Sequence, residues 1–407
     1  MNKVRASIAL FAAVTVLASA CTKAERNQPD GVLDPQKRSH SSGAIVVEEV
    51  ADGLNVGWDI GFLPDGKVLI PERPGTLSVV SSTKPGAKVS KVKADLPKPY
   101  VEAEGGLLGM VLHPDFEKSR QFTLCQTTEA DGKPKDIRLT TWRLSKDNKR
   151  AEHVKDLITG LPIHKTGQHV GCRPTIGPDG ELLIGTGDAW QPTTSQDKTN
   201  LGGKVLRVDL KTGKGLPDNP FADSKDENTR RILSFGHRNV QGVAVRPDNN
   251  EVWTVEHGPG HDDEVNLIKP GGNYGWDPSL KGELSDPESY TKQDPKTEMT
   301  NRELYPDAVE AKWATGTPTE AMCAGTFLEG KNWGNLDGSL VVTSLKGSKL
   351  LLMSVDGNSD VVKVDVPKEL DETYHRLRAA RIGPDGALYL TTAGGENDYL
   401  LRVTPGK

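Results

Sequence analysis

The chain has 407 residues, of which 43 are glycine and 27 are proline, and 35% of its residues are hydrophobic. This length allows one large all-β domain or two ordinary domains, and the even spread of Gly and Pro favours many short strands and turns over disorder. The 51 Lys and Arg residues are outnumbered by 56 Asp and Glu residues, which gives a formal net charge of −5. Because the chain has no basic stripe, its composition excludes a nucleic-acid-binding function.

The chain begins with the features of an export signal. Two positive charges lie within residues 1–5, residues 6–20 are small or apolar with only Ser and Thr as interruptions, and Ala18-Ser19-Ala20 precedes Cys21. This run is too short for a comfortable membrane span and predicts a secretory signal peptide over residues 1–20. The segment before Cys21 resembles a bacterial lipoprotein box. It predicts a lipid on Cys21 as the only membrane contact, with ordinary cleavage after Ala20 as the alternative.

The polar segment 21–42 is expected to form a tether between that lipid and a folded domain. The predicted location is therefore the outer face of the cell membrane if Cys21 is lipidated. If Cys21 is not lipidated, we expect a secreted or periplasmic protein.

A turn tetrad with Pro-Asp at its centre recurs along the chain, each time between two short apolar runs. Its Asp residues are Asp65, Asp115, Asp179, Asp248 and Asp385. The successive intervals are 50, 64, 69 and 137 residues, and the longest contains a sixth, degenerate copy within residues 323–345. Repeated hairpins without a helical period predict an all-β fold, a six-bladed β-propeller over residues 43–407 whose first and last strands share one blade. A β-sandwich with a second β domain is the alternative.

Three cysteines remain when Cys21 is set aside, in an exported and therefore disulfide-permissive setting. Cys125 is expected to end the second strand of its repeat, and Cys172 to begin the first strand of the next repeat. Both then lie near one rim on neighbouring blades. We therefore expect a disulfide between Cys125 and Cys172, with Cys323 free.

The loops that enter the innermost strands of a propeller converge at one end of its central channel. The residues just before each hairpin are therefore the predicted site, and they occupy residues 104–109, 168–173, 236–239, 313–323 and 374–378. They contain a candidate base, several cations and an aromatic residue. They contain neither a Ser/His/Asp triad nor a Gly-rich phosphate loop. The polar insertion 278–307 is expected on the same rim.

His169 and Asp188 are the candidate catalytic pair. His169 lies where the third hairpin begins, and Asp188 follows the second strand of that hairpin. Antiparallel pairing therefore returns the carboxylate to the rim that carries the imidazole. A carboxylate that holds one ring nitrogen leaves the other to accept a proton, although a single His is more often structural.

The stretch from Gly236 to Trp276 carries two polar clusters that flank a short hairpin. The first cluster contains Arg238 and Asn239, and the second, residues 256–264, is rich in carbonyls and carboxylates. Arg and Asn suit an anionic ligand, whereas carbonyl and carboxylate oxygens suit a hard cation. The alternative is a solvated polar loop.

The motifs GHRNVQG, EHGP, DDEVNLI and GGNYGW in this stretch resemble the soluble sugar dehydrogenases that use pyrroloquinoline quinone (PQQ). That family has a six-bladed β-propeller. The resemblance implies that His169 is the general base that removes the proton of the sugar C1 hydroxyl. It implies hydride transfer from an aldose to PQQ, with a lactone as the product. An external quinone or cytochrome is then expected to accept the electrons.

The resemblance also implies a ligand set for PQQ and for Ca²⁺. The residues that correspond to cofactor positions are Glu104, Arg238, Asn239, Trp313, Lys346, Arg376 and Arg378. The carbonyls of Gly258 and Pro259 correspond to ligands of the calcium that touches the quinone. Glu264 and the Tyr274 carbonyl correspond to a further calcium site.

Two residues depart from the family pattern. Glu104 stands where the better-known members have Gln, and a carboxylate there would repel PQQ unless it is protonated or paired. Glu310 stands where some members have Tyr. Both changes bear on cofactor affinity and substrate range.

Two other functions are compatible with the predicted fold. One is a calcium-stabilised propeller that binds a ligand without catalysis, and the other is a metal-dependent lactonase. A lactonase would place acidic and Asn ligands around the channel, whereas the predicted rim is rich in Arg, Lys and His. Fold alone does not decide between these functions.

Overall fold

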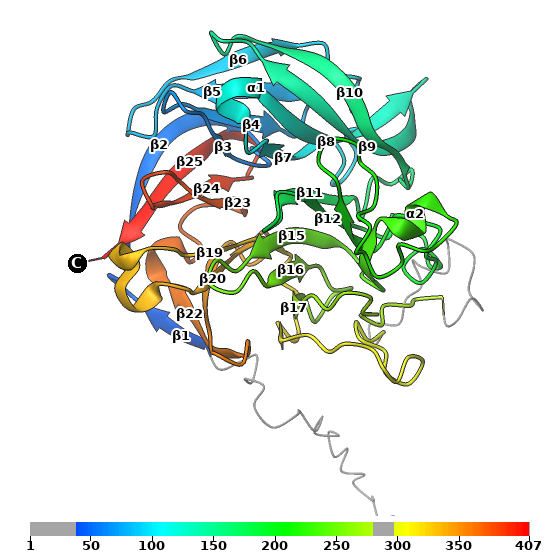
Figure 1. Ribbon diagram of the computed structural model, residues 1–407. Helices are drawn as coiled ribbons and strands as arrows, with labels where there is room; N and C mark the ends of the chain where they lie inside the picture. Colours follow the sequence, from blue (N-terminus) through cyan, green and yellow to red (C-terminus); the bar gives the residue numbers. More distant parts are fainter. Residues whose placement is uncertain (1–37, 280–296, 407) are drawn as a thin grey trace, which may run out of the picture. The chain divides into compact units, whose positions relative to one another are not determined.

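Antiparallel strands account for most of the regular structure in the computed structural model, which describes residues 38–279 and 297–406 (Figure 1). The described strands form six blades, which confirms the predicted all-β, six-bladed β-propeller. The helices are short: α1 (Phe116–Ser119), α2 (Glu227–Arg230), and the 3-10 helices η1 (Lys331–Leu336) and η2 (Lys368–Leu370). Within the described ranges, no helix is long and apolar enough to cross a membrane.

Each blade is built in chain order from its innermost strand outward. Blade one contains β3 (Gly61–Phe62), β4 (Val68–Glu72), β5 (Thr76–Val80) and β6 (Val89–Ala94). Blade two contains β7 (Leu107–Leu112), β8 (Gln121–Ala130), β9 (Lys133–Leu144) and β10 (Arg150–Leu161). Blade three contains β11 (Gly171–Ile176), β12 (Leu182–Thr186), β13 (Lys204–Val208) and β14 (Ile232–Phe235). The outermost strands β6 and β10 pair in parallel, so blades one and two form one continuous sheet.

The second half of the ring continues in the same way. Blade four contains β15 (Val240–Val245), β16 (Val252–Glu256), β17 (Glu264–Leu267) and β18 (Trp313–Ala314). Blade five contains β19 (Met322–Phe327), β20 (Leu340–Ser344), β21 (Leu350–Val355) and β22 (Val361–Pro367). Blade six contains β23 (Leu377–Ile382), β24 (Leu388–Thr392), β25 (Glu396–Pro405) and the early strand β2 (Ile45–Asn55).

The ring is closed by strands from opposite ends of the chain, as the sequence predicts. β2 pairs antiparallel with β25 over the register from Ile45 opposite Pro405 to Asn55 opposite Glu396. Figure 1 shows the blue strand β2 beside the red strand β25. This pairing covers edges that would otherwise remain open.

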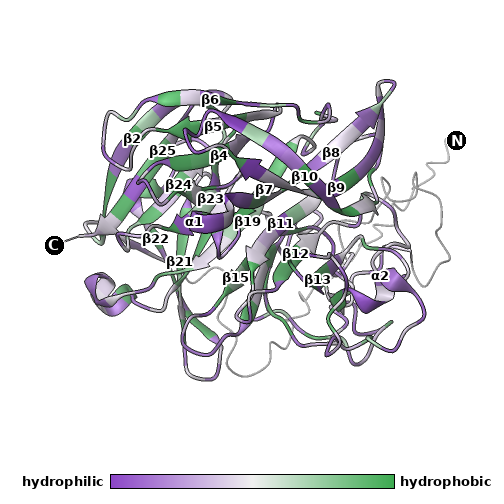
Figure 2. Ribbon diagram, turned by 45° about the horizontal axis from the view of Figure 1, so that its top comes forward, coloured by the Kyte–Doolittle hydropathy of each residue, from purple (hydrophilic) through white to green (hydrophobic). Residues whose placement is uncertain are grey.

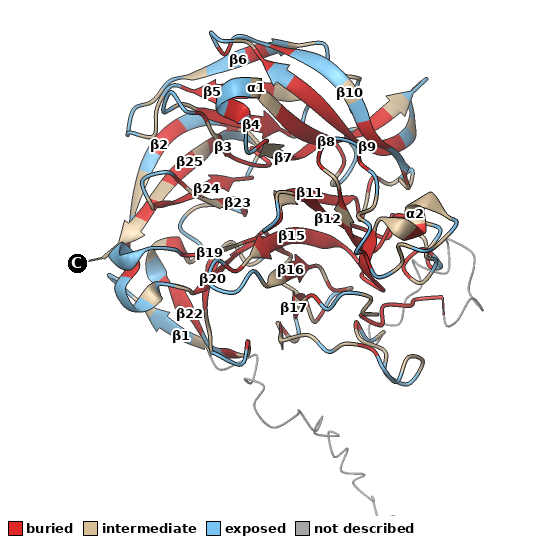
Figure 3. Ribbon diagram, viewed as in Figure 1, coloured by how far each residue is buried: buried red, intermediate tan, exposed pale blue. Residues whose placement is uncertain are grey.

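Burial follows the position of a strand within its blade. The second strands β4, β12, β20 and β24 are buried at every residue, because blades pack against both of their faces. Most residues of the outermost strands β6 and β10 are exposed or half-buried. Figure 2 shows the corresponding hydropathy and Figure 3 the corresponding burial. The core therefore lies between the blades.

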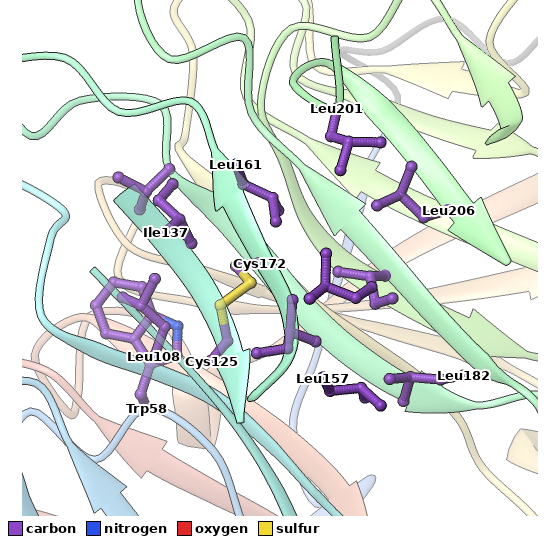
Figure 4. Close-up of a cluster of buried hydrophobic side chains, with 14 of the residues drawn as sticks. Trp58, Leu108, Cys125, Ile137, Leu157, Leu161, Cys172, Leu182, Leu201 and Leu206 are labelled. Atoms are coloured by element: carbon purple, nitrogen blue, oxygen red, sulfur yellow. A yellow bond between two sulfur atoms is a disulfide. The ribbon is translucent and has the colours of Figure 1, made fainter. Parts of the chain in front are cut away.

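The predicted disulfide between Cys125 and Cys172 is present, and Cys323 is free and buried. Cys125 lies within β8 rather than at its end, and Cys172 lies at the start of β11, with their Cα atoms 6.2 Å apart. The bridge joins blades two and three inside a cluster of buried hydrophobic side chains (Figure 4). It also lies close in sequence to His169.

We expect the double substitution Cys125→Ser and Cys172→Ser to lower the free energy of unfolding by about 2–4 kcal/mol, because the cross-link no longer restricts the unfolded chain. Denaturant unfolding without reductant measures this difference. Wild-type protein in excess dithiothreitol is the control and should approach the variant. A variant as stable as the oxidised wild type would contradict the stabilising role.

A further strand, β1 (Arg38–Ser41), extends blade five by pairing in parallel with β22. It lies inside segment 21–42, which the sequence predicts as a tether. The remaining tether, the predicted signal peptide with Cys21, and residues 280–296 of the predicted insertion lie outside the described residues.

Candidate active site

Irregular pairing marks the start of five of the six innermost strands. The strand register shifts near the first residues of β7, β11, β15, β19 and β23. His169 and Cys172 also adopt the left-handed region, with φ of +52° and +65°. Such bulges re-aim side chains and are common next to functional sites. The backbone thus turns away from regular pairing at the loops where the sequence places the site.

His169 and Asp188 form the predicted pair. The Nδ1 atom of His169 lies 2.8 Å from Oδ1 of Asp188, and both residues are buried. The Trp276 indole donates to the other oxygen of Asp188 at 2.8 Å, and the Trp190 backbone N–H donates to Oδ1 at 2.9 Å. These bonds fix the carboxylate, which in turn orients the imidazole and leaves Nε2 as the nitrogen suited to proton transfer.

The electrostatics of the site keep His169 neutral near neutral pH. Burial lowers the pKa of His169 most, the positive charge of Arg238 lowers it further, and Asp188 opposes both effects. The net result is a pKa below the ordinary histidine value. A neutral imidazole can accept a proton, as a general base must.

Glu104 is held as a carboxylate by amide donors rather than by a guanidinium. Asn239 donates to its two oxygens at 3.2 and 3.1 Å, Gln241 donates at 2.9 Å, and the His169 backbone N–H donates at 3.3 Å. Burial would raise the pKa of Glu104, but these hydrogen bonds help to hold it below the usual value. The amide donors satisfy the oxygens of Glu104 but leave its negative charge in the site.

Gln241 is a site residue that the sequence reasoning missed. Its amide contacts Glu104 and the Asn239 side-chain oxygen, and its side-chain oxygen lies 3.4 Å from Nη1 of Arg378. A signal existed, because Asn239 and Gln241 are two residues apart and so share one face of a strand. Gln241 connects the Glu104 side of the site to Arg378.

Arg238 is anchored by the loop that follows β16. Its backbone N–H donates to Glu256 at 2.9 Å, and its Nη1 donates to the His257 carbonyl at 2.8 Å. The guanidinium carbon lies 5.4 Å from the centroid of the Trp276 ring. Arg238 thus connects the two polar clusters that the sequence predicts to be neighbours.

Arg378 lies on the opposite side of Gln241. Its guanidinium carbon lies 3.7 Å from the centroid of the Trp58 ring, and its Nη1 lies 3.3 Å from the Cys323 sulfur. Arg173 approaches the same sulfur at 3.7 Å and donates to the Trp58 carbonyl at 2.7 Å. Two buried guanidiniums therefore lie close together in the channel.

Several buried nitrogens in this region make no hydrogen bond within the described part of the chain. They are Nε of Arg238, Nε of Arg378, Nε2 of His257 and Nε1 of Trp313. Buried polar groups without partners are costly, so their presence indicates a ligand site. Two of these nitrogens belong to arginines, and a third belongs to His257, which contacts Arg238. This donor set fits an anionic ligand with several carboxylates.

The remaining predicted cofactor residues lie apart from this cluster. Lys346 is exposed on the loop between β20 and β21. Arg376 is exposed on the segment between η2 and β23. Trp313 is buried in β18, within the hydrophobic core between blades four and five. The structure thus leaves Lys346, Arg376 and Trp313 outside the cluster. The predicted site residues that it joins in one hydrogen-bonded region are His169, Asp188, Glu104, Asn239, Arg238 and Arg378.

The predicted calcium loop is tightly turned. The Gly258 N–H donates to Asp263 at 2.8 Å, and a Cβ at Gly258 would lie 1.8 Å from the His261 carbonyl, so only glycine fits. Asp263 also accepts from the Glu320 N–H at 2.8 Å. Asp263 therefore holds the loop together. Among the described residues, no three His, Cys, Asp or Glu side chains gather in a geometry for a metal ion.

The residues of the second predicted calcium site lie behind this loop. Glu264 is buried, and Asn266 and Thr300 donate to its carboxyl at 3.3 and 3.2 Å. Burial and the nearby Glu256 raise the pKa of Glu264 well above the usual value. The Tyr274 side chain is buried and stacks on His237. A cation at this position would relieve the repulsion between the two carboxyl groups.

A family model described as "Glucose / Sorbosone dehydrogenase" matches residues 54–402. The chain belongs to this family. This match confirms the family resemblance that the motifs between Gly236 and Trp276 indicate. The prediction that it is a sugar dehydrogenase is confirmed as well.

Individual proteins and solved structures are similar to this chain over most of its length. It is 31% identical over 380 residues to the aldose sugar dehydrogenase YliI of Escherichia coli K12, which covers 89% of this chain and 93% of that one. It is similar to the apo-form crystal structure of the soluble aldose sugar dehydrogenase of Escherichia coli, with a TM-score of 0.75, 30% identity, and coverage of 89% and 99%. It is also similar to the PQQ-bound aldose sugar dehydrogenase of Streptomyces coelicolor, with a TM-score of 0.70, 26% identity, and coverage of 88% and 98%.

Proposed function

We propose that this protein is an exported aldose sugar dehydrogenase that uses PQQ and Ca²⁺ to oxidise the sugar C1 hydroxyl to a lactone. The observation that carries the proposal is the buried His169–Asp188 pair, together with Arg238 and Arg378, whose Nε atoms have no hydrogen-bond partner among the described residues. The pair can take a proton, and the guanidiniums can hold an anionic cofactor. The similarity to a PQQ-bound aldose sugar dehydrogenase supports the same reading.

The roles of the residues follow from their positions. The sugar C1 hydroxyl gives its proton to Nε2 of His169, and Asp188 stabilises the resulting imidazolium through Nδ1. PQQ, when bound, supplies the acceptor for the hydride that leaves C1. The guanidiniums of Arg238 and Arg378 would bind and orient its carboxylates, together with Asn239, the exposed residues Lys346 and Arg376, and the buried Trp313.

Calcium has two candidate positions in this proposal. The carbonyls of Gly258 and Pro259 would hold the ion next to the cofactor, because Ca²⁺ prefers oxygen ligands and the turn at Gly258 leaves no room for a side chain. Glu264 and the Tyr274 carbonyl would hold a second ion. Glu264 is buried beside Asn266 and Thr300, and a cation there would favour its ionised form.

Export and electron transfer complete the proposal. The N-terminal signal with Cys21 would direct the protein to the outer face of the membrane, and the Cys125–Cys172 disulfide fits an oxidising compartment. There the enzyme would pass electrons to an external quinone or cytochrome.

The direct test is reconstitution of purified apoprotein with PQQ and Ca²⁺, followed by dye reduction with a panel of aldoses. We expect dye reduction that requires PQQ, an aldose and Ca²⁺, and that is lost when Ca²⁺ is removed by a chelator. Binding of PQQ without aldose-dependent reduction would favour the non-catalytic binding module. Hydrolysis of lactones with a metal ion alone would favour the lactonase.

A further inference from the structure

The strand β1 is attached to blade five by specific side-chain contacts as well as by backbone pairing. The Ser39 hydroxyl donates to Oδ1 of Asp365 at 2.6 Å, and the Ser41 hydroxyl bonds the other oxygen of the same carboxylate. The parallel register places Arg38 opposite Val364. These contacts fix where the side chain of Arg38 can reach.

Arg38 reaches into the junction between blades four and five. Its Nη1 forms an ion pair with Oε1 of Glu320, and both side chains are only 14% exposed. Its guanidinium carbon lies 5.2 Å from the centroid of the Trp313 ring. A pocket of about 250 Å³ lies beside this pair, lined by residues from β1 and from the loop 315–320. Because the pair is mostly shielded from solvent, salt screens it less than an ordinary surface ion pair.

Glu320 is a junction between two loops of the proposed cofactor site. Its backbone carbonyl accepts from the N–H groups of Lys346 at 2.8 Å and Gly347 at 3.0 Å. Its backbone N–H donates to Asp263, which in turn accepts from the Gly258 N–H. Glu320 therefore joins the loop that carries Lys346 to the loop that carries the Gly258 and Pro259 carbonyls.

We propose that Arg38 is a positioning residue for the cofactor site, and that β1 is a working part of the enzyme as well as the end of a tether. Arg38 acts through the side chain of Glu320, whose backbone sets the places of Lys346 and Gly258. The inference rests on the proposed function, because it treats these two loops as ligands of PQQ and calcium. It adds a residue from outside the repeated hairpins to the set that forms the site.

The first test is independent of cofactor and activity. In the apoprotein of Arg38→Ala, we expect amide hydrogen exchange at Lys346 and Gly347 to be faster by about tenfold, because their acceptor on Glu320 is less fixed. His40→Ala is the matched control. His40 lies on the same strand and lines the same pocket, but its ring lies 3.4 Å from Asp371 instead of Glu320. Equal exchange in Arg38→Ala and wild type would overturn the proposal.

The second test is a PQQ titration followed by tryptophan fluorescence and by dye reduction. For Arg38→Ala we expect half-saturation at about tenfold more PQQ, which corresponds to about 1.4 kcal/mol, while turnover at saturating PQQ changes little. Arg38→Lys keeps the charge and should recover most of the affinity. If wild type binds PQQ and Arg38→Ala binds it equally well, the inference fails. If wild type shows no PQQ binding, the proposed function fails instead.

Discussion

Replacing His169 with Ala should lower kcat by roughly 10² to 10⁴, the usual contribution of a positioned general base. The apparent affinity for PQQ and Ca²⁺ should stay near that of wild type, because those ligands are assigned to other residues. The measurement is steady-state dye reduction on apoprotein titrated with PQQ at saturating calcium and aldose. The buried bond between His169 and Asp188 makes this the largest effect that we expect.

His153→Ala is the matched control for this prediction. His153 also pairs with an aspartate, Asp156 at 2.9 Å, but it lies exposed on the outer strand β10. We expect its activity to equal that of wild type. A His169→Ala enzyme that keeps more than about one tenth of the wild-type kcat would fall outside the range for a general base and contradict the assignment.

Replacing Arg238 with Ala should show the opposite pattern. The variant should need about 10- to 100-fold more PQQ for half-saturation, since a hydrogen bond to a charged group contributes about 1.5–3 kcal/mol. Once loaded, it should keep substantial activity. Arg150→Ala is the control, because Arg150 is exposed at the start of the outer strand β10. Equal, small losses in His169→Ala and Arg238→Ala would favour the binding module.

The Arg238→Ala variant should also differ from wild type in the pH profile of kcat. The positive charge of Arg238 lowers the pKa of His169, so its removal should raise that pKa. The base works only when neutral, and activity falls as pH drops through its pKa. The acidic limb of kcat should therefore move to higher pH in Arg238→Ala and stay near its wild-type position in Arg238→Lys. An unchanged limb in Arg238→Ala would show that Arg238 does not tune the base.

The fold could be predicted because its signals are local. A Pro-Asp turn such as the one at Asp179 fixes the chain reversal within a few residues, and five such turns connect the first and second strands of their blades. The pairing of His169 with Asp188 is equally local, because one hairpin brings both to the same rim. The closure of the ring by β2 and β25 followed from the need to cover open edges.

The parts that could not be predicted depend on how blades meet across the channel. Gln241 lies between Glu104 and Arg378 only because blades two, four and six face one another there. Nothing near Glu104 in the sequence indicates that amides from blade four would hold its charge. The parallel pairing of β1 with β22 could likewise not be predicted from the sequence, because a four-residue polar strand has no hydrophobic pattern.

The closure of the ring also has a consequence for how the chain folds during its synthesis. The strand β2 is made early, but its partner β25, residues 396–405, is made after every other described strand. Until then β2 has an unpaired edge that can pair with another chain, and contacts so distant in sequence form slowly. A premature stop at residue 396 would leave five blades complete and the sixth without its third strand. Residues 396–405 thus decide whether a nascent chain becomes a closed ring or an aggregation-prone arc.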